Sequence, residues 1–157
     1  MKESFRKGFG FGLTSGTITT LGMIVGLHSV TTSKMVIIGG IFTIAIADAL
    51  SDAMGTHISE EFEGKHSTKE IWEAAASTFV AKLLFALTFA VPVSLLELPT
   101  AITVSVVWGL FVIIVFSFLM ANQQKANTLH IVLEHLIIAI VVIVITHEVG
   151  DLIATLT

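Results

Sequence analysis

Two aspartates lie four residues apart in an otherwise apolar stretch of the chain. Asp48 and Asp52 belong to the run IADALSDAMGTHISEEFE, which begins apolar and ends acidic. At 100° per residue, one narrow stripe of a helix through this run carries Asp48, Asp52, Gly55, Ser59 and Glu63. An ionisable side chain inside an apolar segment is costly, so such residues are functional candidates. The stripe predicts an acidic track through the apolar region.

A pair of hydroxyl side chains matches this track in depth. Ser15 and Thr19 share one face of the preceding apolar segment. If the membrane edge lies near His57, Ser15 is about 10 Å deep, Asp52 about 8 Å and Asp48 about 14 Å. Carboxylate and hydroxyl oxygens are ligands for hard or borderline divalent cations. We therefore expect Asp48, Asp52, Ser15 and Thr19 to form a metal site.

The composition indicates which class of protein holds these residues. Of 157 residues, 54% are hydrophobic and 13% charged, and the mean hydropathy is +0.94. A soluble domain of this length could not bury so much apolar surface. Because there is no cysteine, disulfides and thiolate metal sites are excluded. The net charge of −4 offers no basic patch for nucleic acid.

Five apolar segments are long enough to cross a bilayer as helices, which takes about 20 residues each. We expect an all-α integral membrane protein with one transmembrane domain, 1–157, and spans at about 8–30, 35–57, 71–96, 101–121 and 131–154. The loops between them are short, so consecutive spans should pack as antiparallel neighbours. The result is a multi-pass protein of the lipid bilayer, in the plasma membrane if the source is prokaryotic.

The loop charges predict how the chain is oriented. Six basic residues fall before span 1 or in the loops after spans 2 and 4, and the opposite loops hold only Lys34. The positive-inside rule then makes the N-terminus cytoplasmic and the C-terminus external. Five spans, an odd number, likewise put the two termini on opposite sides of the membrane.

Two further groups of polar residues flank the proposed site. His57, Glu60 and Glu61 belong to a cytoplasmic mouth, where acidic side chains raise the local cation concentration. A plain solvated loop is the alternative. In the last span, we expect an exit or proton path through Glu134, His147 and Glu148, although the outer residues of this group are equally expected at the membrane interface.

The third span carries a lysine and a proline. Lys82 can extend its ammonium to the cytoplasmic headgroups, which is the interpretation we favour. The alternative is that Asp48 and Asp52 are structural, either as an interhelical hydrogen-bond pair or in a salt bridge to Lys82. Pro92 should kink its helix. In span 1, glycines at four-residue spacing should let helix backbones approach closely.

Two motifs resemble those of the vacuolar iron transporter family. SGTITTLGMIVG, residues 15–26, is similar to the family's first-span pattern Asp-Gly-x-x-Thr-Thr-x-Gly-x-x-x-Gly. ADALSDAMGTHISEEFE, residues 47–63, resembles the second-span signature Ala-Asp-x-Leu-Ser-Met-x-x-Gly-x-x-x-Ser-x-x-x-Glu. A looser likeness runs to THEVGDLI, residues 146–153, so the resemblance spans nearly the whole chain.

The resemblance implies a five-span homodimer that exports Fe²⁺ or Mn²⁺ from the cytoplasm in exchange for protons. It also adds Ser51 and Glu63 to the expected metal residues. The chain looks like a short form, because a brief polar loop replaces the family's cytoplasmic metal-binding domain. Ser15 stands where the family has aspartate, and Asp52 where it has methionine. Loss of the soft methionine ligand favours harder ions such as Mn²⁺.

We therefore expect a transporter, not an enzyme, with no permanently bound cofactor. Two carboxylates so close in a low dielectric cannot both ionise cheaply, so the empty pair should retain a proton that the metal displaces. One alternative is a membrane-embedded metal or redox enzyme that uses the last span. The other is a non-transporting membrane scaffold packed through its glycines.

Overall fold

The computed structural model describes residues 3–156 and is helical almost throughout, without a strand in that range. Its elements are α1 (Glu3–Val30), α2 (Lys34–Glu63), α3 (Thr68–Thr88), α4 (Ala90–Leu95), α5 (Leu98–Gln124) and α6 (Thr128–Ala154). Because α3 and α4 together form the third span, five helical segments are long and apolar enough to cross a membrane. The predicted all-α fold with five such spans is confirmed.

Local sequence signals define where α2 ends and where α3 begins. α2 ends at Glu63 and is capped by Gly64, whose φ of 63° is in the left-handed region that glycine adopts without strain. Ser67 then begins α3 with a capping box: its hydroxyl oxygen accepts from the Glu70 N–H, and the Glu70 carboxylate accepts from the Ser67 N–H. The loop is therefore short and well defined.

The third span is interrupted one turn before Pro92, as the sequence predicts. Pro92 has no N–H to donate to the Thr88 carbonyl, so α3 ends at Thr88 and α4 resumes at Ala90. At the junction the Phe89 N–H donates to the Ala86 carbonyl, a tighter turn than that of an α-helix. Trp108 of α5 donates its indole N–H to the Thr88 hydroxyl across this break, at 3.0 Å.

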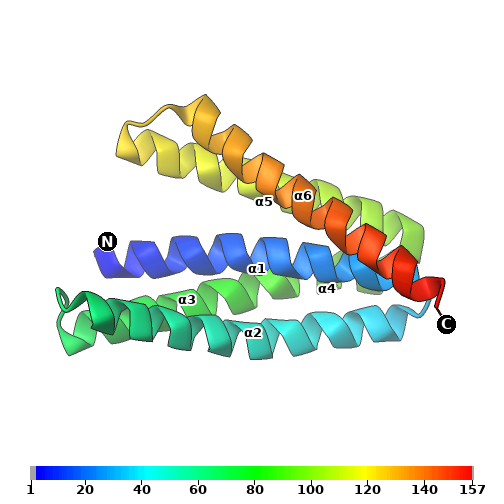
Figure 1. Ribbon diagram of the computed structural model, residues 1–157, viewed down its shortest axis with the longest axis horizontal. Coiled ribbons are helices and arrows are strands. Elements are labelled where there is room, and N and C mark those ends of the chain that lie inside the picture. The colour runs from blue at the N-terminus through cyan, green and yellow to red at the C-terminus, as the bar shows by residue number, and fades with distance from the viewer. Residues whose placement is uncertain (1–2, 157) are drawn as a thin grey trace.

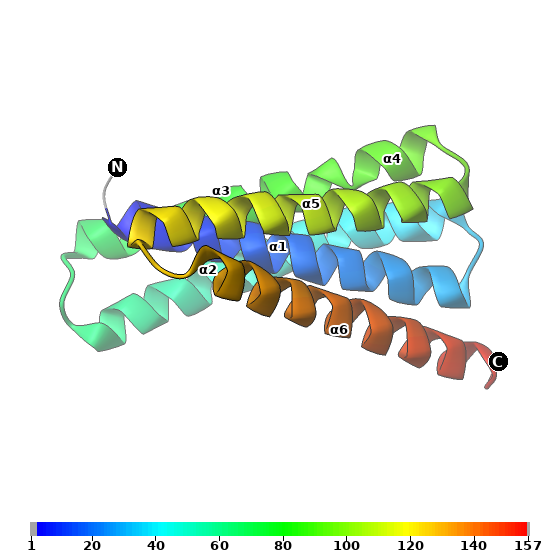
Figure 2. The ribbon, with the colours of Figure 1, turned by 90° about the horizontal axis from the view of Figure 1, so that it is seen from above.

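Helix α1 lies in the middle of the bundle, between the α5–α6 pair and the α2–α3 pair (Figure 1). It contacts α2, α3, α5 and α6. Figure 2 shows α5 and α6 diverging from their connecting loop, with α1 behind them. The two ends of the described chain lie at opposite ends of the bundle, as an odd number of spans requires. Consecutive helices do touch, but the most extensive contact joins α1 to α3, which run in the same direction.

Glycines make this close contact between α1 and α3 possible. Gly12 lies directly on the Thr78 backbone, and a Cβ there would collide with the Thr78 carbonyl oxygen. One turn earlier, the Gly8 carbonyl accepts a hydrogen bond of 3.1 Å from the Thr78 hydroxyl. Farther along α1, Gly26 meets the backbone of Gly150 in α6. The expected close approach of helix backbones is confirmed.

The outer surface of the bundle is apolar. Large hydrophobic side chains such as Phe111, Ile137 and Val144 are more than 45% exposed. Exposed apolar patches of this extent suit lipid rather than water. The fold is therefore that of a multi-pass membrane protein by length and composition.

Substitution of Gly12 tests the α1–α3 contact. Gly12→Ala should lower the free energy of unfolding by about 1–3 kcal/mol, because the added methyl group meets backbone that cannot give way. Titration with a denaturing detergent in mixed micelles measures this. The control is Gly10→Ala, since a Cβ at Gly10 would meet only the end of the Phe116 ring and no backbone. Equal effects of the two substitutions would contradict the account.

Candidate ion-binding site

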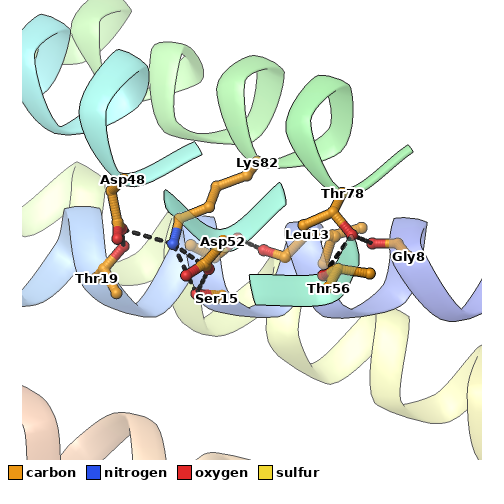
Figure 3. Close-up of polar contacts among 10 residues, drawn as sticks. Gly8, Leu13, Ser15, Thr19, Asp48, Asp52, Thr56, Thr78 and Lys82 are labelled. Atoms are coloured by element: carbon orange, nitrogen blue, oxygen red, sulfur yellow. Dashed lines mark hydrogen bonds and ion pairs between the residues drawn. The ribbon is translucent and has the colours of Figure 1, made fainter. Parts of the chain in front are cut away.

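The two predicted polar stripes face each other across the α1–α2 contact (Figure 3). The Ser15 hydroxyl donates to Oδ2 of Asp52 at 2.7 Å, and the Thr19 hydroxyl donates to Oδ2 of Asp48 at 2.9 Å. The expected juxtaposition of carboxylates and hydroxyls is confirmed. Whether these four residues bind a metal stays a prediction.

A third helix contributes the positive charge of this site. Nζ of Lys82, from α3, lies 2.6 Å from Oδ2 of Asp48 and forms an ion pair with Asp52. It also donates to the Ser15 hydroxyl oxygen at 2.9 Å. The favoured prediction that Lys82 extends to the headgroups is wrong, because the residue is 1% exposed. The alternative, an ion pair with both aspartates, is what the structure contains.

Gly16 explains why Lys82 turns inward. A Cβ on Gly16 would lie only 2.9 Å from Cγ of Lys82. The missing side chain of Gly16 therefore leaves room for the lysine stem to cross α1 towards α2 (Figure 3). The ammonium then reaches the two carboxylates, and these ion pairs offset the loss of its hydration.

The charges of the three groups do not cancel. With their ordinary charges, two carboxylates and one ammonium sum to one formal negative charge. The lysine side chain is 2% exposed, whereas those of Asp48 and Asp52 are 28% and 22% exposed. The carboxylates are therefore reachable from outside the bundle while their internal counter-ion is not. Lys82 supplies a positive charge beside both carboxylates, and the retention of a proton by the empty pair stays a prediction.

The other two expected metal residues lie apart from this group. Ser51 is exposed on α2. Glu63 accepts from Nζ of Lys7 at 3.1 Å, and it lies 11 residues, or about 16 Å along the helix, beyond Asp52. Within residues 3–156, no group of three or more histidine or acidic side chains is arranged so that it could hold a metal ion. A cation at Asp48 and Asp52 would thus rely on two carboxylates, hydroxyls and water.

Glu60, one of the residues expected at the cytoplasmic mouth, is buried and paired within the protein. The Glu60 side chain is 1% exposed, 2.5 Å from Nζ of Lys7 and 3.3 Å from Nε2 of His66. Its charge is therefore compensated within the protein. The His57 ring packs against Trp72 with the ring planes tilted by 50° and the centroids 4.4 Å apart, and its Nε2 is 4.0 Å from the exposed Glu61 carboxylate.

The expected exit residues do not form one group. Nδ1 of His147 hydrogen-bonds with the Ser29 hydroxyl at 2.6 Å, and Nε2 lies 3.6 Å from Asp151. Glu148 is exposed beside them. Glu134 is exposed near the opposite end of α6, 14 residues or about 21 Å away. A proton path through all three predicted residues stays a prediction.

Sequence reasoning gave the pairing of Lys82 with the aspartates only as the alternative, and it missed Lys7 and His66 as partners of Glu60. One signal could have found Lys82. It follows Ala74 and Thr78 at four-residue spacing, which is the spacing of the small residues on α1. All three therefore share the face of α3 that packs against the α1 glycines.

The sequence matches no model of a known protein family and no curated protein. The resemblance to the vacuolar iron transporters thus rests on the sequence patterns alone.

Removal of the ammonium tests the ion-pair network. Lys82→Met should lower the free energy of unfolding by about 3–5 kcal/mol, because it leaves two carboxylates without their buried counter-ion. Adding Asp52→Asn to Lys82→Met should recover part of this loss. Detergent titration in mixed micelles gives the values, with Lys125→Met at an exposed loop position as control. A loss no larger than that of the control would contradict the network.

Proposed function

We propose that this protein is a proton-coupled transporter of divalent cations, and that Asp48 and Asp52 bind the cation. The observation that carries the proposal is the buried Lys82 ammonium between two partly exposed carboxylates. A charged group inside a membrane protein is expensive and marks ion or proton pathways. Here the chain's own cation occupies the position that a transported cation would take.

Exchange follows from the charges of this arrangement. A divalent cation that binds both carboxylates repels the ammonium 2.6 Å from Asp48. Lys82 then releases one proton to water and stays neutral beside the bound cation. When the cation leaves on the other side, Lys82 takes up a proton and returns to the aspartates. One proton is therefore exchanged for each divalent cation, because the cation and the protonated Lys82 never occupy the two carboxylates together.

The donor atoms favour a hard cation. Carboxylate and hydroxyl oxygens from Asp48, Asp52, Ser15 and Thr19 are the groups at hand, and they suit Mn²⁺ as well as Fe²⁺. Met54 is 55% exposed and does not join them. We therefore infer that Mn²⁺ is preferred over softer ions.

The direction of transport rests on the loop charges. The α1 start, the α2–α3 loop and the α5–α6 loop lie at one end of the bundle (Figure 1), and they carry Arg6, Lys7, Lys65, Lys69 and Lys125. The positive-inside rule makes this end cytoplasmic. Export from the cytoplasm is the direction that the likeness to the vacuolar iron transporters supports.

A second candidate is a structural scaffold. The observation in its favour is that Lys82 contacts both carboxylates and the Ser15 hydroxyl, so the network is stable without any bound ion. A scaffold predicts that neutral replacements which keep the packing, such as Asp52→Asn together with Lys82→Met, preserve function. A transporter predicts that they abolish it.

Cation flux tests the two candidates directly. In proteoliposomes with a pH gradient, wild-type protein should carry Mn²⁺, and Asp48→Asn or Asp52→Asn should reduce the rate at least tenfold, because each removes a charged ligand. A fluorescent Mn²⁺ indicator inside the vesicles measures the rate. Glu97→Gln, in the exposed loop before α5, is the control. No flux in wild type, or equal flux in both aspartate variants and the control, would contradict the proposal.

We further infer a homodimer that forms through α2. A ridge of small exposed residues runs along this helix at four-residue spacing: Gly39, Thr43, Ala47, Ser51, Gly55 and Ser59. A Cβ at Gly39 or Gly55 would meet no atom within 4 Å, so the ridge is free to receive another helix. Small residues at this spacing promote helix association in membranes. The partly exposed Asp48 and Asp52 lie beside the ridge, where a second copy would shield them from lipid.

Cysteine cross-linking tests this interface, because the natural chain contains no cysteine. Gly55→Cys should give a disulfide-linked dimer in membranes under mild oxidation, since the two α2 ridges would face each other. Electrophoresis without reductant detects it. Ile137→Cys, on the exposed face of α6, is the control and should stay monomeric. Equal cross-linking at the two positions, or none at Gly55, would exclude the α2 interface.

A further inference from the structure

A second lysine sits among carboxylates at the N-terminal end of the α1–α2 contact. Nζ of Lys7 lies 2.5 Å from Oε1 of Glu60 and 3.1 Å from Oε1 of Glu63. Lys7 belongs to the second turn of α1, and the two glutamates belong to the last turn of α2. The ion pairs therefore join the two helices that hold the candidate site.

Glu60 is unusual for a residue at the end of a membrane helix. It is 1% exposed, and its Oε2 has no hydrogen-bond partner within the described residues. Oε2 lies 3.3 Å from Nε2 of His66 in the α2–α3 loop, but without hydrogen-bond geometry. A buried carboxylate is costly without partners. The ion pair with Lys7 is therefore the main interaction that holds the Glu60 carboxylate in this buried position.

The antiparallel helices put their contacts in a regular order along the α1–α2 seam. Thr19 meets Asp48, Ser15 meets Asp52, and Lys7 meets Glu60 and Glu63. The Lys7 ion pairs therefore lie nearer the N-terminal end of the bundle than the Ser15–Asp52 contact, and the Thr56–Thr78 hydrogen bond lies between them. A cation that approached along the seam from this end would meet Lys7 before the aspartates.

We propose that the Lys7–Glu60 ion pair is the gate on the N-terminal side of the site. The ammonium bridges α1 and α2 and closes the seam, and it must part from Glu60 before a cation can pass. Once Lys7 has moved away, the two glutamates face the seam as carboxylate oxygens that a divalent cation can contact on its way to Asp52. This inference rests on the proposed function, because a gate needs a transported ion.

Thiol labelling tests closure without any transport measurement. Ser15→Cys adds a single thiol beyond the gate in a chain without cysteine. A small, charged, membrane-impermeant thiol reagent is applied from the side that carries the N-terminus. Labelling should be slow in this background and at least tenfold faster when Lys7→Ala is added. The matched control is Arg6→Ala, which removes a neighbouring cation that binds Gln123 of α5 instead. Equal rates with and without Lys7→Ala, or equal acceleration by Arg6→Ala, would overturn the gate.

Reversible cross-linking tests whether the gate must open for transport. In Lys7→Cys/Glu60→Cys, a short bifunctional methanethiosulfonate should stop Mn²⁺ flux, and reductant should restore it. Arg6→Cys/Gln123→Cys, treated in the same way, ties α1 to α5 at the same end and should keep its flux. If flux continues after cross-linking of the first pair, or stops equally in the second, the gate is wrong. Absence of flux before cross-linking in wild type would instead count against the proposed function.

Discussion

The bundle is organised around one buried ammonium. Lys82 crosses from α3 over Gly16 of α1 to reach two carboxylates on α2. This interaction requires α1 and α3 to approach at backbone distance, and the glycines of α1 allow that approach. It also requires α2 to lie against both of them, since its two aspartates would otherwise be charges without a partner in an apolar medium. Three helices are therefore held in one register by a single side chain.

Such an arrangement is an expensive way to stabilise a fold. A buried ion pair is often matched or exceeded in stability by well-packed apolar side chains of similar volume, and this chain is rich in them. On the proposed function, the charges add a site that a different cation can take. The incomplete compensation, two carboxylates to one ammonium, and the partial exposure of the aspartates both fit exchange better than a closed structural pair.

The sequence was sufficient to predict the five apolar spans, the break at Pro92 and the facing of Ser15 and Thr19 towards Asp52 and Asp48. Those features follow from length, helical periodicity and the chemistry of single residues, which are local properties. The position of Lys82 is not local. It depends on which helix packs in parallel with α1, and loop lengths say only which helices are joined. For the same reason the sequence places Glu60 either at a cation-attracting mouth or in a plain solvated loop, although Lys7, some fifty residues earlier in the chain, pairs with it.

The central claim is that a divalent cation and the Lys82 proton compete for the same two carboxylates. Proton release on cation binding measures this most directly, with Mn²⁺ added to purified protein in a weakly buffered micellar solution that contains a pH indicator. The account predicts release of about one proton for each Mn²⁺ bound, and almost none in a Lys82→Gln variant that still binds the ion. Binding without proton release in wild type, or the same release in Lys82→Gln, would contradict it.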